Sequence, residues 1–294
     1  MSLLFRISLV TFLLLFETVT AIHRNTIWQD DLSLWKDTVK KSPNKARIHN
    51  NLGTVCLAVS KEWAFKEFRE AIRLNPNLAE PHNNLASLLN EQGQYGEALK
   101  ELELALNIWP SYADAHSNLG NALKGMGRYD LAEQEFRKAI AIKPGHYTAW
   151  LNLGNVLYQQ GRPTECFQAF QRAIELKPDY AEAYNNLGNL YRIQGENEKA
   201  VSSYETAIRY KPGYAEAYNN LGNMYKIRGD IEKAILTYQE ALRANPSIVE
   251  IRINLANTYI AQGDMASAER ECTIIERLAP NHPLLNQLKA MISP

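Results

Sequence analysis

A proline recurs at intervals of 34 residues through most of this 294-residue chain, and these prolines define an internal repeat. The recurring residues are Pro76, Pro110, Pro144, Pro178, Pro212, Pro246 and Pro280. Segments 181–189 and 215–223, which lie one interval apart, are identical in sequence. A chain made of short repeats folds as a linear stack in which each unit packs on its neighbours. We therefore divide residues 46–282 into seven units of 34 residues, the first one residue shorter, and number the positions within a unit from 1.

The pattern within each unit predicts a pair of helices. Position 24 is mostly aromatic and positions 20 and 27 are mostly alanine, a spacing that gives the second helix one apolar stripe. Position 8 is glycine or alanine, which lets the two helices approach closely. The recurring proline ends the second helix. A glycine is expected to end the first helix in the left-handed conformation, and these glycines are Gly93, Gly127, Gly161, Gly195, Gly229 and Gly263.

These features together resemble the tetratricopeptide repeat (TPR), and the resemblance covers all seven units. It implies an all-α fold, namely a right-handed superhelical TPR solenoid of antiparallel helix pairs. Because a solenoid needs half-polar ends, we predict an N-terminal capping half-repeat over residues 23–45 and a C-terminal capping helix over residues 283–294. The first unit has Ser60-Lys61-Glu62 where a glycine turn is expected, so we predict weaker stacking or a distorted turn there.

The first 22 residues differ in character from the repeats. Arg6 precedes an uncharged, mostly apolar run from Ile7 to Phe16, and the small residues Val19 and Ala21 follow it. This order is typical of a secretory signal peptide. The alternative is an uncleaved membrane anchor over residues 2–22. Either one predicts a secreted or membrane-anchored protein whose TPR body is extracytoplasmic, in the periplasm or a lumen.

Composition narrows the class of partner. The chain has 32 Lys and Arg residues against 32 Asp and Glu residues, so it lacks the positive excess of a general nucleic-acid-binding protein. Three cysteines in 294 residues exclude a disulfide scaffold. Cys56, Cys166 and Cys272 fall at apolar positions of separate units, where they are predicted to pack in the core. The predicted partners are therefore proteins or peptides.

Asparagine recurs at two positions for which the apolar packing pattern gives no reason. Positions 6 and 9 share one stripe of the first helix, whereas the packing positions 4, 8 and 11 form another stripe. A carboxamide both donates and accepts hydrogen bonds, which suits the alternating N–H and C=O groups of an extended peptide. We therefore predict a peptide-binding groove on the concave side, and the alternative is a solvated helix face copied by duplication. The predicted peptide-binding residues are Asn51, Asn84, Asn118, Asn152, Asn186, Asn220 and Asn254 at position 6, and Asn121, Asn155, Asn189, Asn223 and Asn257 at position 9.

The sequence predicts no enzyme activity. Position 2 is mostly acidic, which suits the positive end of a helix dipole, and the alternative is a preference for basic ligands. His49, His82 and His116 share position 4 of successive units, so they lie too far apart to bind one metal ion and are predicted to be packing residues. No glycine-rich phosphate loop and no catalytic constellation is present, and no cofactor or metal site is expected.

The segment between the apolar run and the repeats carries a second resemblance. Residues 23–30, 34–39 and 42–47 read HRNTIWQD, LWKDTV and SPNKAR. This segment resembles the junction between the last membrane helix and the TPR array in the transmembrane-and-TPR O-mannosyltransferase family, whose catalytic part this sequence lacks. The resemblance implies an alternative function, the non-catalytic, substrate-recruiting part, split or truncated, of a membrane protein O-glycosyltransferase. Its partner would then be a membrane glycosyltransferase.

Overall fold

The computed structural model describes residues 30–292, which form helices and, within this range, no strand. The predicted signal peptide or anchor of residues 1–22 lies outside the described residues. The helices are α2 (Asp31–Lys41), α3 (Ala46–Cys56), α4 (Lys61–Leu74), α5 (Ala79–Glu91), α6 (Tyr95–Ile108), α7 (Ala113–Gly125), α8 (Tyr129–Ile142), α9 (Tyr147–Gln159), α10 (Pro163–Leu176), α11 (Ala181–Ile193), α12 (Asn197–Tyr210), α13 (Ala215–Ile227), α14 (Ile231–Ala244), α15 (Val249–Gln262), α16 (Met265–Leu278) and α17 (Pro283–Ile292). The predicted all-α class is confirmed.

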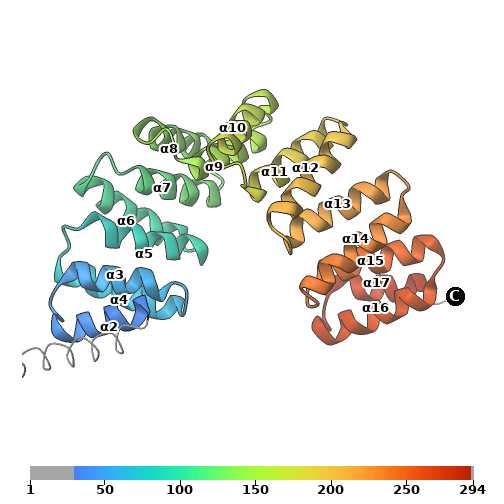
Figure 1. Cartoon of the computed structure of the whole chain (residues 1–294), viewed down its shortest axis with the longest axis horizontal. Coiled ribbons are helices and arrows are strands. Elements are labelled where there is room, and N and C mark those ends of the chain that lie inside the picture. The colour runs from blue at the N-terminus through green and yellow to red at the C-terminus, as the bar shows by residue number, and fades with distance from the viewer. Residues whose placement is uncertain (1–29, 293–294) are drawn as a thin grey trace, which may run out of the picture. The chain divides into compact units, whose positions relative to one another are not determined.

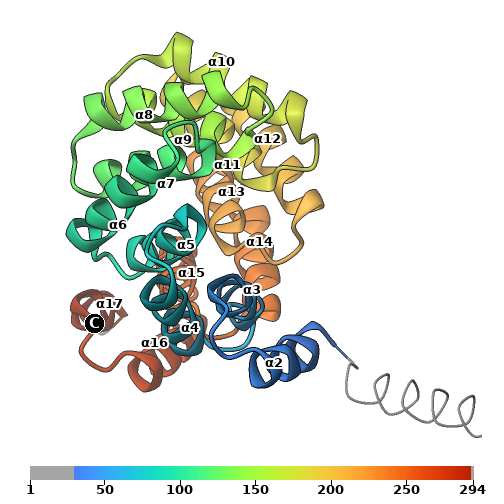
Figure 2. The ribbon, with the colours of Figure 1, turned by 90° about the vertical axis from the view of Figure 1, so that its left-hand side faces the viewer.

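The chain divides after residue 144 into two compact bodies. The N-terminal body contains α2–α8, and the C-terminal body contains α9–α17. In each body the helices pair into hairpins, from hairpin 1 (α3 and α4) to hairpin 7 (α15 and α16), and consecutive hairpins pack side by side (Figure 1). A view turned by 90° again places α6 of hairpin 2 beside α7 of hairpin 3 (Figure 2). This stacking is that of a TPR solenoid.

The first helices of neighbouring hairpins meet along one side of each body. In the N-terminal body α3 contacts α5 and α5 contacts α7, and in the C-terminal body the same holds along α9, α11, α13 and α15. Among the described residues, no second helix contacts the second helix of a neighbouring hairpin. Each stack therefore curves toward its first helices, which line its inner side.

Backbone conformation explains where the helices end. The second helices end two residues before the recurring proline, and the residue between them leaves the helical conformation; it is extended at Asn75, with φ −150° and ψ 94°, and at Asn245. The proline ring clashes with a preceding residue that is helical. The proline therefore keeps the residue before it out of the helical conformation, and the helix ends there. The six glycines predicted to end the first helices all have positive φ, from 70° at Gly161 to 84° at Gly263. A residue with a side chain would be strained there.

Packing inside a hairpin depends on a size match between positions 8 and 24. A Cβ atom added to Gly120 would lie 2.6 Å from the Phe136 ring, closer than any packed contact allows. The glycines of hairpins 1, 4, 5 and 6 meet their aromatic partners equally closely. Hairpin 2 instead pairs Ala86 with Leu102, and both side chains are buried. A smaller residue at position 24 thus accompanies a larger one at position 8.

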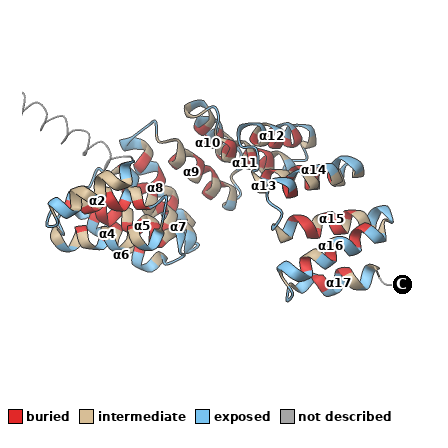
Figure 3. Ribbon diagram, turned by 60° about the horizontal axis from the view of Figure 1, so that its bottom comes forward, coloured by how far each residue is buried: buried red, intermediate tan, exposed pale blue. Residues whose placement is uncertain are grey.

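Helix α2 lies within residues 23–45 and α17 within residues 283–294, the two segments predicted as caps, of which residues 23–29 and 293–294 lie outside the described residues. In the N-terminal body α2 packs on α3, and Trp35 contacts the hydrophobic core. In the C-terminal body α17 packs on α15 and α16 and buries Leu285 and Leu288. Figure 3 shows buried residues where helices meet and exposed residues on the outer faces and turns. Within residues 30–292, no helix combines the length and apolar character needed to cross a membrane.

Hairpin 1 builds its turn without glycine. Helix α3 ends at Cys56, and the turn continues to Ser60, whose hydroxyl accepts a hydrogen bond from the Trp63 backbone N–H at 3.2 Å. This side-chain cap satisfies a backbone donor at the start of α4. The turn is altered, as the sequence suggested, while α3 and α4 still pack together.

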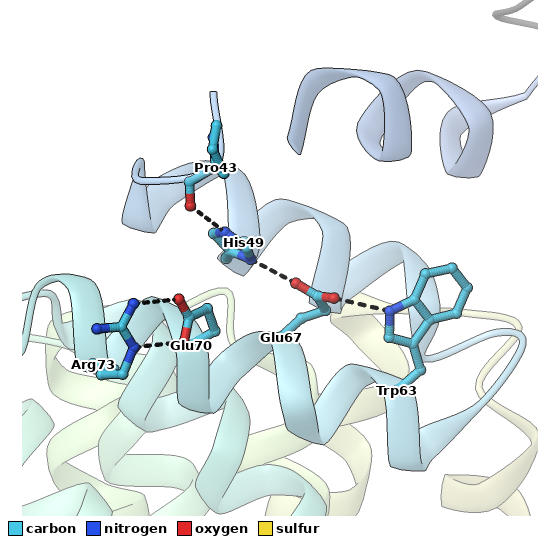
Figure 4. A network of polar contacts seen from close by, with 6 residues as sticks. All are labelled: Pro43, His49, Trp63, Glu67, Glu70 and Arg73. Atoms are coloured by element: carbon cyan, nitrogen blue, oxygen red, sulfur yellow. Dashed lines mark hydrogen bonds and ion pairs between the residues drawn. The ribbon is translucent and has the colours of Figure 1, made fainter. Parts of the chain in front are cut away.

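The position-4 histidines are buried in ion pairs that the sequence analysis did not predict. His49 lies 2.7 Å from a Glu67 carboxylate oxygen through Nδ1 and 2.8 Å from the Pro43 carbonyl oxygen through Nε2 (Figure 4). Glu67 also accepts a hydrogen bond from the Trp63 indole at 2.9 Å (Figure 4). Both imidazole nitrogens of His49 thus lie within hydrogen-bond distance of an oxygen.

The same arrangement recurs in hairpins 2 and 3. His82 lies 2.5 Å from Glu101, and His116 lies 2.6 Å from Glu135. The hydrogen bond with Glu135 raises the pKa of His116 above its ordinary value. Burial lowers the pKa of His82, but its hydrogen bonds with Glu101 and the Pro76 carbonyl outweigh burial and raise the pKa overall.

Positions 4 and 23 vary together along the chain. In hairpin 7, Arg252 replaces the histidine and makes both contacts, to the Pro246 carbonyl at 2.7 Å and to Glu271 at 2.6 Å. In hairpins 4, 5 and 6 an aromatic residue at position 4 accompanies a small residue at position 23, as with Tyr218 and Thr237 in hairpin 6. A permanent cation thus makes the same contacts as the three histidines. This agrees with the raised pKa values of His82 and His116, which favour their protonated state.

Candidate functional site

The predicted asparagines lie half-buried on the first helices. The N-terminal body holds Asn51, Asn84, Asn118 and Asn121, and the C-terminal body holds Asn152, Asn155, Asn186, Asn189, Asn220, Asn223, Asn254 and Asn257. Because the first helices line the inner side of each stack, positions 6 and 9 form a row of amides within each body.

Position 6 links neighbouring hairpins. The Asn220 Nδ2 donates to the Asn185 Oδ1 of the preceding hairpin at 2.9 Å, and the Asn254 Nδ2 donates to the Asn219 Oδ1 at 2.7 Å. In the N-terminal body, Asn84 and Asn118 donate in the same way to position 5 of the preceding hairpin, to Asn50 and Asn83. One amide donor at each of these positions is therefore occupied by the fold.

Hairpin 4 shows why position 5 matters. Its position 5 is Leu151, which has no acceptor. The Asn186 Nδ2 instead donates to the Asn155 Oδ1 at 2.7 Å. The bond between hairpins therefore moves to the position-9 asparagine when position 5 cannot accept it.

Position 9 keeps its amide donor available in hairpins 5 and 6. The Tyr204 hydroxyl donates to the Asn189 Oδ1 at 2.8 Å, and the Tyr238 hydroxyl donates to the Asn223 Oδ1 at 2.7 Å. Both tyrosines are fully buried, which fixes the oxygen end of each amide toward the core. The Nδ2 of neither asparagine donates to any residue in the described part of the chain.

Two pockets in the C-terminal body lie along this row. A pocket of about 270 Å³ is lined by Asn155, Tyr158, Gln159, Phe170, Asn186 and Asn189. A second, of about 580 Å³, is lined by Arg192, Asn220, Asn223, Lys226 and Ile227. Five asparagines of hairpins 4 to 6 thus border open space large enough for peptide groups, namely Asn155, Asn186, Asn189, Asn220 and Asn223.

The position-2 acids lie at the start of the first helices, whereas Arg192 and Lys226 of the second pocket lie at position 12, near the end of those helices. Ten residues, or about 15 Å of helix, separate position 2 from position 12. Glu182 at position 2 pairs with Lys211 at 2.6 Å. Burial alone would raise the pKa of Glu182, but the hydrogen bond with Lys211 outweighs it and leaves that pKa below its ordinary value. This pairing weakens the prediction of a preference for basic ligands.

Sequence reasoning identified the asparagine row but not its hydrogen-bond partners. The buried Asn185 at position 5 accepts from position 6, and the position-24 tyrosines hold position 9. The signal in the sequence is that Asn at position 5 precedes Asn at position 6 in four units. Among the described residues, no group of three or more His, Cys, Asp or Glu side chains could hold a metal ion.

Three family models match the chain, and each is described as a tetratricopeptide repeat. One matches residues 77–144 and 146–212, a second matches residues 185–247, and a third matches residues 225–292. These matches begin at residue 77, so they do not test the resemblance of residues 1–47 to the O-mannosyltransferase family. No curated protein matches the chain.

Solved structures share the fold at low sequence identity. A chain of the APC/C hetero-tetramer Cut9-Hcn1 is 14% identical with a TM-score of 0.70, and the match covers 89% of this chain and 52% of that one. The present chain thus spans about half the length of that relative. Pseudomonas aeruginosa pilF is 21% identical with a TM-score of 0.61, covering 72% of this chain and 96% of that one. Yeast Tom70 is 16% identical with a TM-score of 0.66, and the match covers 89% of this chain and 57% of that one. From its repeat pattern, its stacked hairpins and these matches, the chain belongs to the tetratricopeptide repeat family, whose repeats are protein-interaction modules.

Proposed function

We propose that the amide row of the C-terminal body binds extended peptide segments, mainly through their backbone. The observation that carries this proposal is the arrangement at position 9. Buried tyrosine hydroxyls hold the oxygens of Asn189 and Asn223, and the N–H₂ groups remain available beside the two pockets. A donor whose orientation is fixed before binding loses little entropy when it meets a peptide carbonyl.

Position 6 has a different role in this proposal. Its donors bridge neighbouring hairpins, as Asn220 does with Asn185. Replacing position 6 would therefore disturb both hairpin spacing and any ligand contact. Position 9 gives the cleaner test, because an aspartate there keeps the oxygen that accepts from tyrosine and removes the amide donors.

The test compares two triple variants on an array of synthetic peptides of mixed sequence. We expect the wild-type chain to bind many unrelated peptides and the Asn155→Asp, Asn189→Asp, Asn223→Asp variant to lose most of this binding. Loss of two or three hydrogen bonds of about 1 kcal/mol each corresponds to a decrease in affinity of about 30-fold to 150-fold. Circular dichroism would check that both variants are folded.

The control replaces three exposed asparagines outside the row with aspartate. Asn107, Asn281 and Asn286 are suitable because they are exposed and the same net charge is introduced. We expect this variant to bind like the wild type. Equal binding by the row variant and the control variant, both folded, would contradict the proposal.

We further propose that residues 1–22 export or anchor the protein, so that the TPR body is extracytoplasmic. The apolar run after Arg6 and the small residues at 19 and 21 support this proposal. Fractionation and protease protection of the full chain test it, and a body found only in the cytoplasm would contradict it.

The alternative function, a substrate-recruiting part of a membrane protein O-glycosyltransferase, is supported by the resemblance of residues 1–47. It requires a complex with a membrane glycosyltransferase. Cross-linking of the full chain in its own membranes, followed by identification of the linked proteins, would test this alternative.

A further inference from the structure

The larger pocket of the C-terminal body contains two cations beside two amides. Arg192 near the end of α11 and Lys226 near the end of α13 both occupy position 12 of their hairpins. Asn220 and Asn223 complete the polar part of the lining. Helices α11 and α13 contact each other, so the two cations come from neighbouring hairpins.

Neither cation has an acidic partner within the described part of the chain. The first helices do carry acids at position 2, but Glu182 is paired with Lys211, and Glu216 accepts a hydrogen bond from Asn185 at 2.9 Å. Arg192 lies close to the Tyr204 hydroxyl. Burial raises the pKa of Tyr204 to about 12, while Arg192 opposes this rise. Arg192 is thus held beside the same tyrosine that fixes Asn189.

The apolar part of this surface is also exposed. Ile227 lines the pocket and is 65% exposed, and Ile193, at the same position of α11, is 60% exposed. Each of these isoleucines directly follows a cation that has no acidic partner. Cationic and apolar side chains therefore alternate along this surface. A ligand that suits it carries both negative charge and apolar side chains.

We propose that this pocket binds the carboxylate side chains of an acidic peptide segment. The inference rests on the proposed function, because the amide row holds the peptide backbone while Arg192 and Lys226 select its side chains. The Arg192 guanidinium and Lys226 ammonium each donate charge-assisted hydrogen bonds to a carboxylate. The carboxylates belong to internal Asp or Glu residues, since an extended chain passes along several hairpins.

The spacing of the cations sets a register for the ligand. Packed helices lie about 10 Å apart, and an extended peptide advances about 3.3 Å per residue. Successive position-12 side chains therefore face ligand residues about three apart. An acidic residue at every third position, with apolar residues between, is the pattern that fits best.

The experiment measures binding of the full chain to three synthetic peptides by fluorescence anisotropy. All have amidated C-termini and a background of serine and leucine, and they carry Glu, Gln or Lys at every third position. We expect the Glu peptide to bind most tightly, with an affinity that falls as salt is added. The Arg192→Gln, Lys226→Gln variant should lose about tenfold in affinity for each charge-assisted bond removed, or about 1.4 kcal/mol per bond.

A matched control removes the same charge elsewhere. Arg243 and Arg277 are exposed near the ends of α14 and α16, and neither forms an ion pair among the described residues. The Arg243→Gln, Arg277→Gln variant should bind the Glu peptide like the wild type. The charge-reversed Arg192→Glu, Lys226→Glu variant should prefer the Lys peptide, which would also show that it is folded.

The outcomes separate this inference from the proposed function. Equal binding of the Glu, Gln and Lys peptides, with loss of binding in the position-9 aspartate variant, would overturn the acidic-ligand inference and leave backbone binding in place. Equal loss in the Arg192/Lys226 and Arg243/Arg277 variants would also overturn the inference, because net charge alone would explain it. Failure of every peptide to bind would contradict both proposals.

Discussion

The N-terminal body should lose stability as the pH rises through the neutral range. His82 and His116 have pKa values raised in the folded state by their Glu101 and Glu135 partners. A raised folded pKa adds stability that is fully present below the unfolded value of about 6.5 and is lost as the pH rises through the folded value. The folded N-terminal body should therefore be more stable in mildly acidic solution than at alkaline pH.

Arginine at the same positions should remove this pH dependence. Arg252 makes both contacts in hairpin 7, so the His82→Arg, His116→Arg variant keeps a cation that does not titrate in this range. Hydrogen exchange of the full chain, compared between wild type and variant at each pH, measures the difference for α5–α8. Hairpin 6, which has Tyr218 and Thr237 at these positions, serves as the internal control. Parallel pH dependence in wild type and variant would contradict the prediction.

Removing the carboxylate should have the largest effect at low pH. The side chains of His116 and Glu135 are 11% and 12% exposed, so this pair is largely shielded from water. Breaking a buried ion pair by removing one partner costs about 3 kcal/mol. Glu135→Leu should cost about that much in mildly acidic solution and less at alkaline pH, where His116 is neutral and is no longer left as an unpaired charge. Lys138, which also pairs with Glu135, is exposed and adds little.

Gly120→Ala should destabilise the N-terminal body, although alanine is the better helix former. The added methyl would lie 2.6 Å from the Phe136 ring. Overpacking of this kind costs about 1–3 kcal/mol, which exceeds the gain of about 1 kcal/mol from helix propensity. Urea unfolding should therefore show a lower midpoint for the variant.

A second variant, Phe136→Leu, tests whether contact with the Phe136 ring causes this loss of stability. Hairpin 2 packs Ala86 with Leu102, so the double variant Gly120→Ala, Phe136→Leu copies a pair that the protein already uses. We expect the double variant to be more stable than the sum of the two single changes implies, by about 1 kcal/mol or more. Gly96→Ala on α6 is the control, since no atom lies within 4 Å of its added Cβ, and it should be neutral or stabilising. Strictly additive effects would show that the ring contact is not the cause.

The fold could be predicted from the sequence because the same residue pattern recurs in each unit. The prolines, the left-handed glycines and the pairing of Gly120 with Phe136 each reflect a local steric rule, and the structure has them where the spacing required. The histidine ion pairs were missed because His82 and Glu101 lie 19 residues apart, and a helical stripe shows only one of them. Comparing positions 4 and 23 across units would have found them.

The candidate site was predictable only in part. Periodicity placed the asparagines on one stripe of the first helices, which is a property of each helix alone. Periodicity could not tell that Asn220 bonds with the preceding hairpin while Asn223 is held by Tyr238, because those bonds depend on how neighbouring helices pack. Arg192 and Lys226 were also missed, since the residue type at position 12 differs from unit to unit.

The three cysteines lie in hairpins 1, 4 and 7, and the thiols of all three are buried. Burial raises the pKa of Cys166 to about 12 and also raises the pKa values of Cys56 and Cys272. A buried, protonated thiol does not react with alkylating reagents until its surroundings open. Timed alkylation followed by mass spectrometry would therefore give a separate opening rate for each of these hairpins in the unmodified protein, without an introduced label.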